Sequence, residues 1–319
     1  MTNQAQPKLL AVVGPTGTGK SDLGLSLAQT IIERGGKAEI INTDSMQFYR
    51  GMNIGTAKLS VDERHGVTHH MIDVLDIREE STAAEYQIKA RPLILDLQHQ
   101  GITPILVGGS MLYIAAALNT FEFPARDEAL RAQLEAELEE SGSHAMHARI
   151  AELDPVAASR LDASNPRRVL RALEILLLTG APFAAALPEV TESWQPVFEI
   201  GLKSDRAHLV DRLHTRVERM WRQGLVAEAE SLIPLGVREG KTSSRAIGYA
   251  QALQQIDGEL TQQQAIEATA QLTSRYARRQ MSWFRRDERI RWFDYQNPNL
   301  FEDVLALADS EAANLMARE

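Results

Sequence analysis

A phosphate-binding loop near the start of the chain constrains the fold more than any other feature. Residues 14–21 read Gly-Pro-Thr-Gly-Thr-Gly-Lys-Ser, which completes the pattern G-x-x-x-x-G-K-[ST]. In such a loop the backbone N–H groups wrap an anion, the lysine reaches the phosphates, and the last hydroxyl binds Mg²⁺. We therefore expect a diphosphate to be bound by Gly14, Pro15, Thr16, Gly17, Thr18, Gly19, Lys20 and Ser21. Mg²⁺ is the expected cofactor, with Ser21 as its protein ligand.

The segments around this loop have the pattern of an α/β fold. An apolar run at 9–13 precedes the loop, and apolar residues at helical spacing follow it at 23–32. Strand-like runs recur at 38–42 and 104–107, each followed by a loop and then by a helical pattern. This alternation is typical of a parallel sheet with helices on its faces. The predicted fold is therefore a P-loop NTPase-like core of the nucleotide-kinase type.

The middle of the chain departs from this alternation. From residue 121 to about residue 187 the patterns are helical and rich in Glu, Ala and Arg. A strand pattern returns at 198–203. Later patterns predict helices at 206–224, 225–235 and 261–284, one more strand within 289–295, and a C-terminal helix. We therefore expect a catalytic core of residues 1–120 and 196–319, interrupted by an all-helical insertion domain at 121–195.

Composition places the chain among ordinary enzyme-sized proteins. With 319 residues and 44% hydrophobic content, it can bury a sizeable core. The absence of cysteine excludes disulfides, a thiol nucleophile and cysteine-based zinc sites. No apolar run approaches the roughly 18 residues that span a bilayer, and the N-terminus lacks a signal-peptide pattern. We expect no membrane partner and a cytoplasmic location.

Charge is distributed unevenly along the chain. The formal net charge of −9 argues against a nucleic-acid partner, because such binding neutralises phosphates with Lys and Arg. Arginines nevertheless cluster at 167–171 and at 275–291, whereas acidic residues crowd 128–140. Two basic patches on an acidic protein favour a polyanionic partner. Arginines that only solvate helix surfaces would give the same pattern.

Two polar residues follow predicted strands and are candidates for chemistry. Asp44 comes after the second strand, where open α/β folds place their ligands, and its carboxylate can act as a base or help to hold Mg²⁺. Ser110 comes after the next strand and two glycines. Its hydroxyl can cap the following helix, line the phosphate site, or do both.

The segment between these two positions holds weaker candidates. Glycines after Asp44 suggest a loop folded tightly over a ligand, with Lys58 available to a phosphate. His69 and His70 with Asp73 offer two imidazoles and an acid. Such a pair is more typical of a hydrogen-bonded loop than of a metal site.

Several longer strings together resemble one family. After the phosphate loop come Asp-Ser-Met-Gln-Phe-Tyr-Arg-Gly-Met-Asn-Ile-Gly-Thr-Ala-Lys at 44–58, His-His-Met-Ile-Asp at 69–73, Pro-Ile-Leu-Val-Gly-Gly-Ser at 104–110, Asn-Pro-Arg-Arg-Val-Leu-Arg at 165–171, Ala-Ile-Gly-Tyr at 246–249 and Arg-Tyr-Ala-Arg-Arg-Gln-Met-Ser-Trp-Phe-Arg at 275–285. In order and content they are similar to the bacterial tRNA dimethylallyltransferases, the IPP transferase family. The resemblance covers about residues 9–295, and so includes the insertion.

The resemblance implies a prenyl transfer to RNA. Members of this family move the dimethylallyl group of dimethylallyl diphosphate to the exocyclic amine of the adenosine 3′-adjacent to the anticodon, in tRNAs that read codons beginning with U. By resemblance, Asp44 accepts the proton of that amine, and Ser110, where the family usually has threonine, bonds the bridging oxygen of the diphosphate. The implied partners are dimethylallyl diphosphate and the tRNA anticodon stem-loop. A monomer is favoured because both basic patches must stay accessible.

The same resemblance implies the remaining binding residues. Arg216 is expected to contact the diphosphate. An adenine stacked in the anticodon loop must be splayed out before an enzyme can reach it, so contacts to neighbouring nucleotides are required. The implied tRNA contacts are Asp44, Ser45, Met46, Gln47, Ser110, Arg131, Arg167, Arg168, Val169, Leu170, Arg171, Arg245, Ala246, Ile247, Gly248, Tyr249 and Ala250.

Two other functions stay open on the residues alone. The phosphate loop would bind ATP in a kinase that acts on a small metabolite. The basic patches would equally serve a noncatalytic RNA-binding protein. Only the prenyltransferase predicts labelled tRNA and released diphosphate from labelled dimethylallyl diphosphate.

Overall fold

The chain divides into two compact units, which we call the core and the insert. The computed structural model describes residues 8–120, 123, 126–180 and 192–316. The core comprises residues 1–119 and 193–319, and the insert comprises residues 120–192. The expected boundaries, after residues 120 and 195, fall close to these. No helix in the described part of the chain is long and apolar enough to cross a membrane.

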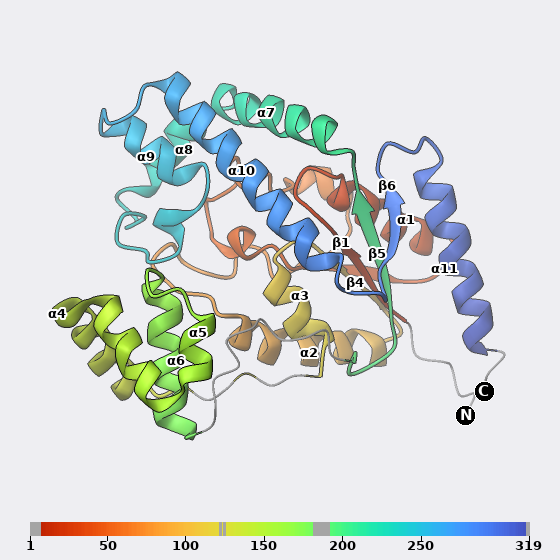
Figure 1. The fold of residues 1–319 in the computed structure, drawn as a ribbon. Helices are drawn as coiled ribbons and strands as arrows, with labels where there is room; N and C mark the ends of the chain where they lie inside the picture. Colours follow the sequence, from red (N-terminus) through yellow and green to blue (C-terminus); the bar gives the residue numbers. More distant parts are fainter. Residues whose placement is uncertain (1–7, 121–122, 124–125, 181–191, 317–319) are drawn as a thin grey trace. The chain divides into compact units, whose positions relative to one another are not determined.

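A parallel sheet forms the centre of the core (Figure 1). Its strands are β1 (Leu9–Val13), β2 (Ala38–Asn42), β3 (His69–His70), β4 (Thr103–Val107), β5 (Val197–Lys203) and β6 (Arg291–Asp294). Their order across the sheet is β3-β2-β4-β1-β5-β6, and every neighbouring pair is parallel. Because all strands point the same way, the loops that follow them leave from one edge. That edge carries the phosphate loop, Asp44 and Ser110.

Helices cover both faces of this sheet. They are α1 (Lys20–Glu33), α2 (Ala83–His99), α3 (Met111–Leu118), α7 (Arg206–Arg222), α8 (Leu225–Leu232), α9 (Tyr249–Ile256), α10 (Gln262–Phe284) and α11 (Leu300–Met316), with short 3₁₀ turns η1 (Ser45–Phe48), η2 (Asp62–Arg64) and η3 (Ser243–Arg245).

Strand β1 is buried on both faces of the sheet. Its successive side chains point to opposite sides, and each side meets an apolar cluster. Leu9 and Ala11 pack into the larger apolar cluster with residues of α2, α3 and α8–α10. Leu10 and Val12 pack into a second cluster with residues of α1 and α11. The predicted P-loop NTPase-like core is therefore confirmed.

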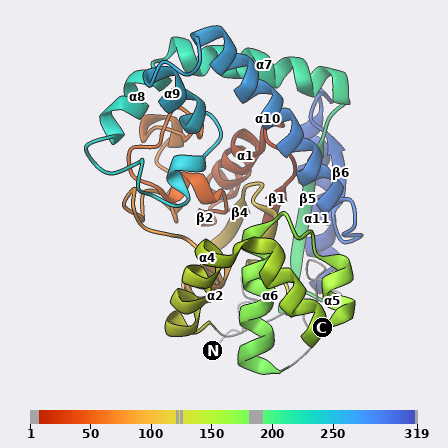
Figure 2. The ribbon, with the colours of Figure 1, turned by 60° about the vertical axis from the view of Figure 1, so that its left-hand side comes forward.

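Two long helices of the core, α7 and α10, lie side by side (Figure 1 and Figure 2). α7 begins directly after β5, so its first turns start at the edge of the sheet that carries the phosphate loop. Asp205 caps α7 by accepting the N–H groups of Ala207 and His208. The apolar stripe of α7, with Leu213 and Val217, is buried, which leaves another face for its arginines.

The described residues of the insert form helices packed around a separate apolar cluster (Figure 2). They are α4 (Glu128–Leu153), α5 (Pro155–Arg160) and α6 (Pro166–Thr179). Asp127, Asp154 and Asn165 each cap the N-terminus of one of these helices with a side-chain oxygen. α4 is kinked at Gly142, because the φ of this residue is 79° and lies in the left-handed region.

Two elements of the core differ from the sequence-based prediction. Residues 69–70, expected in a loop, form the edge strand β3 beside β2. Residues 249–256 form α9, for which no helix was predicted. The strand β3 is only two residues long, which is too short for an alternating pattern to show in the sequence.

Candidate active site

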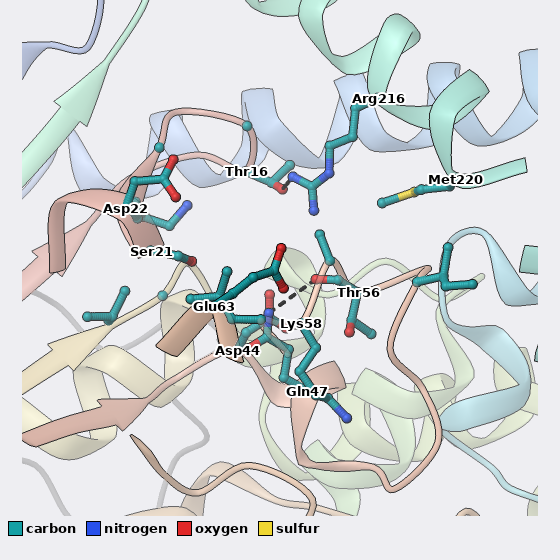
Figure 3. A pocket seen from close by; sticks show the side chains of 18 of the residues that line it. Thr16, Ser21, Asp22, Asp44, Gln47, Thr56, Lys58, Glu63, Arg216 and Met220 are labelled. Atoms are coloured by element: carbon teal, nitrogen blue, oxygen red, sulfur yellow. Dashed lines mark hydrogen bonds between the residues drawn. The ribbon is translucent and has the colours of Figure 1, made fainter. Parts of the chain in front are cut away.

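A cavity of about 1020 Å³ opens at the edge of the sheet where the strands end. Its walls come from four parts of the core: the phosphate loop with the start of α1, the segment from Ile40 to Ile72, the end of β4 at Val107 with the adjacent Gly108, and one face of α7. Figure 3 shows their side chains converging, with Arg216 above, Thr16 and Ser21 beside it, and Asp44 below. The structure thus brings together the residues predicted for the diphosphate and the predicted base.

The phosphate loop is held in shape by its own side chains. Thr18 donates its hydroxyl to the Pro15 carbonyl at 2.9 Å, and Lys20 Nζ donates to the same carbonyl at 2.7 Å. Gly14 is required where the loop leaves β1, because a Cβ there would lie 2.5 Å from the Leu202 carbonyl oxygen. Gly19 caps α1 with a φ of 75°, so the helix begins with its N–H groups turned toward the cavity.

The backbone amide of Thr16 bonds to a side chain of the protein. The Thr16 N–H donates to Gln280 Oε1 at 2.8 Å, so it is not available to an anion. A diphosphate contact of Thr16 through its backbone N–H would require this bond to break. Its hydroxyl still lines the cavity and accepts a hydrogen bond from Arg216 Nη1 at 3.1 Å.

Burial shifts the pKa values of Lys20, Asp44 and Arg216, three of the charged groups that line this cavity. Desolvation lowers the pKa of Lys20 to about 7, with Asp44 opposing the shift and Arg216 adding to it. Desolvation raises the pKa of Asp44, although Met46 N–H, Lys20 and Arg216 act in the other direction. The pKa of Arg216 is lowered, again mainly by desolvation. A site that destabilises its own cations in this way favours an anionic ligand.

Asp44 and Ser110 meet through a short hydrogen-bonded turn. The Met46 N–H donates to Asp44 Oδ1 at 3.0 Å, which caps η1. The Ser45 N–H donates to Ser110 Oγ at 3.1 Å. Ser110 begins α3 but makes no capping hydrogen bond with its side chain, so the capping role expected for it is absent in this structure. Its hydroxyl instead braces the turn that carries Asp44.

Two arginines of α7 were missed in the sequence analysis. Arg212 donates from Nε to the Gly17 carbonyl at 2.7 Å and stacks on the Tyr295 ring, with its Cζ 5.1 Å from the ring centroid. Arg219 lines the cavity as well. With Arg216 they follow the i, i+4, i+7 spacing of one helix face. That spacing is visible in the sequence and could have identified them.

Side-chain hydrogen bonds hold the segment from Asp44 to Lys58 in place. Lys58 Nζ, expected to be available to a phosphate, donates instead to the Tyr49 carbonyl at 2.8 Å and to Asp73 Oδ1 at 2.6 Å. Gln47, predicted to contact tRNA, lines the cavity and donates from Nε2 to the Thr56 carbonyl at 3.1 Å. Lys58 therefore holds the loop closed as part of a structural ion pair.

The predicted tRNA-binding segment at 245–250 is only partly exposed. Arg245 is exposed and Ile247 and Ala250 are half-buried, but Ala246 and Gly248 are buried. The remaining residue, Tyr249, has an exposed fraction of 0%. Its hydroxyl donates to Glu228 Oε1 at 2.5 Å and accepts the Gly55 N–H at 3.2 Å. The Tyr249 side chain therefore holds the loop beside the cavity, and a tRNA contact at this position stays a prediction.

The histidine pair also has internal partners. His69 Nδ1 lies 2.9 Å from the Val67 carbonyl oxygen, and His70 Nε2 lies 2.5 Å from Glu39 Oε2. Burial lowers the pKa of His69. Both histidines form the edge strand β3, and their rings bond within the protein. Of the two, only His69 lines the cavity.

The insert residues predicted to bind tRNA separate into two groups. Arg167 and Arg168 are exposed at the start of α6. Val169 and Leu170 have side chains buried in the apolar cluster of the insert, and tRNA contacts at these two positions stay a prediction. The helix explains this difference in exposure, since neighbouring residues of a helix point in different directions.

The other two predicted arginines of the insert share one buried acid. Arg131 Nη1 lies 3.1 Å and Arg171 Nη1 lies 2.8 Å from Glu174 Oε2, and the Glu174 side chain is fully buried. Arg131 also donates from Nε to Glu135 at 2.9 Å. This pairing gives Arg131 a structural role within the insert, and its tRNA contact stays a prediction.

Comparison with known proteins decides the family. The model of the IPP transferase family matches residues 47–287. The chain belongs to the IPP transferase family. It is 50% identical over 299 residues to the tRNA dimethylallyltransferase of Thermobifida fusca, covering 94% of this chain and 93% of that protein. It is 51% identical over 290 residues to the tRNA dimethylallyltransferase of Kineococcus radiotolerans, covering 91% of each.

Solved structures of this family share the fold. The full-length tRNA isopentenylpyrophosphate transferase from Bacillus halodurans superposes with a TM-score of 0.70 at 38% identity, covering 98% of both chains. A eukaryotic dimethylallyltransferase, described in snapshots of its action on tRNA, gives a TM-score of 0.76 at 25% identity, covering 97% of this chain and 80% of that chain. The IPP transferase fold thus extends over nearly all of this chain.

Proposed function

We propose that this protein transfers the dimethylallyl group of dimethylallyl diphosphate to the N6 amine of the adenosine 3′-adjacent to the anticodon, in tRNAs that read codons beginning with U. One observation carries the proposal. In a chain of the IPP transferase family, a single cavity holds the phosphate loop, a cationic face of α7 and an Asp44 whose pKa is raised. The cationic groups suit a diphosphate, and the carboxylate suits a proton transfer beside it.

The reaction is a substitution at C1 of the dimethylallyl group. The N6 lone pair forms the new carbon–nitrogen bond while the bond from C1 to oxygen breaks, and the electron pair leaves with diphosphate. Lys20 and Arg216 would stabilise the negative charge that develops on this leaving group. Asp44 would take one proton from the attacking amine. A raised pKa makes Asp44 a stronger base than an ordinary carboxylate.

The lining of the cavity also suits Mg²⁺. Ser21 contributes a hydroxyl, and Asp22, Asp44 and Glu63 contribute carboxylates. Mg²⁺ prefers oxygen ligands and is usually held by one or two carboxylates together with substrate phosphates. Ser21 would hold the ion, together with one of these carboxylates. The bound ion would add positive charge beside the departing diphosphate.

Recognition of tRNA is assigned to the exposed members of the predicted set. Arg167, Arg168 and Arg245 are exposed and cationic, so they suit phosphate contacts. Ser45, Met46 and Gln47 follow Asp44 directly and are half-buried beside the site. They suit contacts to the bases next to the target adenosine. Action as a monomer in the cytoplasm completes the proposal.

Labelled dimethylallyl diphosphate tests this function directly. We expect incubation with unmodified tRNA and Mg²⁺ to give labelled tRNA and one equivalent of diphosphate per label, and an A-to-G change at the target position to abolish labelling. Consumption of ATP with no labelled tRNA would overturn the proposal in favour of a kinase. The similarity of the chain to known proteins gives the kinase alternative no support.

A further inference from the structure

A buried glutamine of α10 joins the phosphate loop to the segment that carries Ser110. Gln280 is 2% exposed and uses both ends of its side-chain amide. Its Oε1 accepts the Thr16 N–H at 2.8 Å, and its Nε2 donates to the Gly109 carbonyl at 2.7 Å. The two loops follow the neighbouring strands β1 and β4. One side chain therefore fixes the distance between two loops at the edge of the sheet.

The loops and the glutamine are in direct contact. A Cβ at Gly109 would lie 2.4 Å from Gln280 Nε2 and 2.9 Å from the Gly14 carbonyl oxygen. Position 109 therefore requires glycine, and the phosphate loop, the Gly109 loop and α10 pack without space for another side chain. Such packing transmits a small change at Gln280 to both loops.

From Gly109 the connection continues to the predicted base. Ser110 is the next residue, and its Oγ accepts the Ser45 N–H at 3.1 Å. Ser45 in turn follows Asp44, which lines the cavity. Tyr276, one turn before Gln280 on α10, interacts with both Ser110 and Gln280. α10 thus supports the Asp44–Ser110 pair and the phosphate loop from one helix face.

We propose that Gln280 is a positioning residue, which sets the separation between the loop that holds the diphosphate and the Asp44–Ser110 pair. The proposal rests on the proposed function. A displacement reaction needs the attacking nitrogen, the carbon and the leaving oxygen in one arrangement, and an error of about 1 Å can cost about 10²-fold in rate. Because both amide ends bond to protein, loss of Gln280 should impair turnover far more than binding.

Two substitutions separate the two hydrogen bonds. Gln280→Met keeps the length of the side chain and removes both bonds. Gln280→Glu keeps an acceptor for the Thr16 N–H but removes the donor to the Gly109 carbonyl. We expect kcat to fall about 10²-fold in Gln280→Met and at least tenfold in Gln280→Glu. The Kd values for dimethylallyl diphosphate and for an anticodon stem-loop should change less than threefold.

The matched control is Gln255→Met in the same core. Gln255 accepts the indole N–H of Trp221 at 2.7 Å, so this change also removes a side-chain hydrogen bond between helices, away from the phosphate loop. We expect kcat of the control to stay within twofold of wild type. Comparing Tm across the three variants separates a loss of stability from a loss of positioning.

The pH dependence of kcat distinguishes a positioning role of Gln280 from a purely structural one. A buried carboxyl group has a raised pKa, and once protonated it regains an O–H donor for the Gly109 carbonyl. The ratio of kcat in Gln280→Glu to kcat in wild type should therefore rise as pH falls, while the ratio for Gln280→Met stays flat.

Three results would overturn the role of Gln280: kcat within threefold of wild type in both variants, a loss of kcat that follows the loss of Tm, or a ratio for Gln280→Glu that is constant with pH. Each of them requires an active wild-type protein. Wild-type protein that transfers no label would instead contradict the proposed function itself, so the two failures are distinguishable.

Discussion

Two arginines of the core and two of the insert are held in opposite ways. In the core, Arg216 and Arg212 bond to neutral oxygens of the phosphate loop, the Thr16 hydroxyl and the Gly17 carbonyl. In the insert, Arg131 and Arg171 converge on the carboxylate of Glu174. A cation bonded to neutral oxygens keeps its charge for a ligand, whereas a cation paired with a buried carboxylate is neutralised. The partner of an arginine thus indicates whether it binds ligand or supports structure.

The same contrast separates the two acids. Asp44 accepts one backbone N–H and faces the cavity, whereas Glu174 accepts two guanidinium groups. The first arrangement leaves a carboxylate that can exchange a proton with a substrate. The second uses its carboxylate to join two arginines within the packing of the insert.

The largest expected effect is that of Asp44→Asn. Asparagine can keep the hydrogen bond that caps η1, since it is as good a capping residue as aspartate, but it cannot take a proton at neutral pH. We expect the single-turnover rate of prenyl transfer to fall about 10³-fold, while the affinity for tRNA changes only a few-fold. Equal losses in rate and affinity would show that Asp44 is only a binding residue.

Arg216→Ala should have the next largest effect. Loss of this cation removes charge stabilisation from the departing diphosphate, so kcat/KM for dimethylallyl diphosphate should fall about 10²-fold. Arg222→Ala, on the same helix but outside the cavity lining, is the matched control and should stay within twofold. Similar losses in both variants would remove the distinction between the cavity face of α7 and the rest of the helix.

Glu174→Ala tests the structural side of the comparison. Removal of the shared acid leaves Arg131 and Arg171 close together with no counter-charge from this position, and it leaves a cavity beside them. We expect the free energy of unfolding of the insert to fall by about 2 kcal/mol, measured by chemical denaturation. The exposed Glu139→Ala should change it by less than about 0.5 kcal/mol. An unchanged stability in Glu174→Ala would contradict a structural role.

The pH dependence of kcat/KM should report the charge of Lys20 in the cavity. A lysine is charged only below its pKa, so a pKa of about 7 means that the free protein loses the Lys20 charge as pH rises above 7. We expect kcat/KM for dimethylallyl diphosphate to fall by up to tenfold per pH unit there. At low pH it should fall again as Asp44 becomes protonated, above the usual range for a carboxyl group. Flat kcat/KM between pH 7 and 9 would contradict a need for charged Lys20.

Arg168→Ala should give the smallest effect. One phosphate contact contributes about one unit to the slope of log K against log salt, so binding of an anticodon stem-loop should weaken a few-fold and lose about that much slope. Binding of dimethylallyl diphosphate should not change. A salt slope equal to that of wild type would exclude Arg168 from the RNA contacts.

Much of the core was accessible to prediction because its signals are local. The apolar run at Leu9–Val13, the glycines of the phosphate loop and the leucines of α1 are adjacent in the sequence, and each dictates its own conformation. Asp44 was placed at the site because parallel strands bring their carboxyl ends to one edge. Residues of the phosphate loop, Asp44 and Arg216, which line one cavity, were therefore all named from the sequence.

The sequence did not reveal partners that come from distant parts of the chain. The hydroxyl of Tyr249, a residue predicted to contact tRNA, bonds to Glu228 and to the Gly55 N–H. The Thr16 N–H of the phosphate loop bonds to Gln280, which is 264 residues away in the sequence. No local pattern reveals which hydrogen bonds a side chain makes after folding. The sequence therefore named residues that line the cavity, but it did not show which of them are held by other parts of the protein.

The order of strands in the sheet means that one edge of β1 must wait for its partner during synthesis. β1 lies between β4 and β5, and β5 is made only after the whole insert. While the insert emerges from the ribosome, one edge of the most buried strand has no partner, and an unpaired apolar edge is a template for wrong pairing. Independent folding of the insert would leave β5 free to pair with that edge as soon as it emerges. The yield of soluble protein should therefore depend on the helices of the insert, even though the catalytic cavity lies wholly within the core.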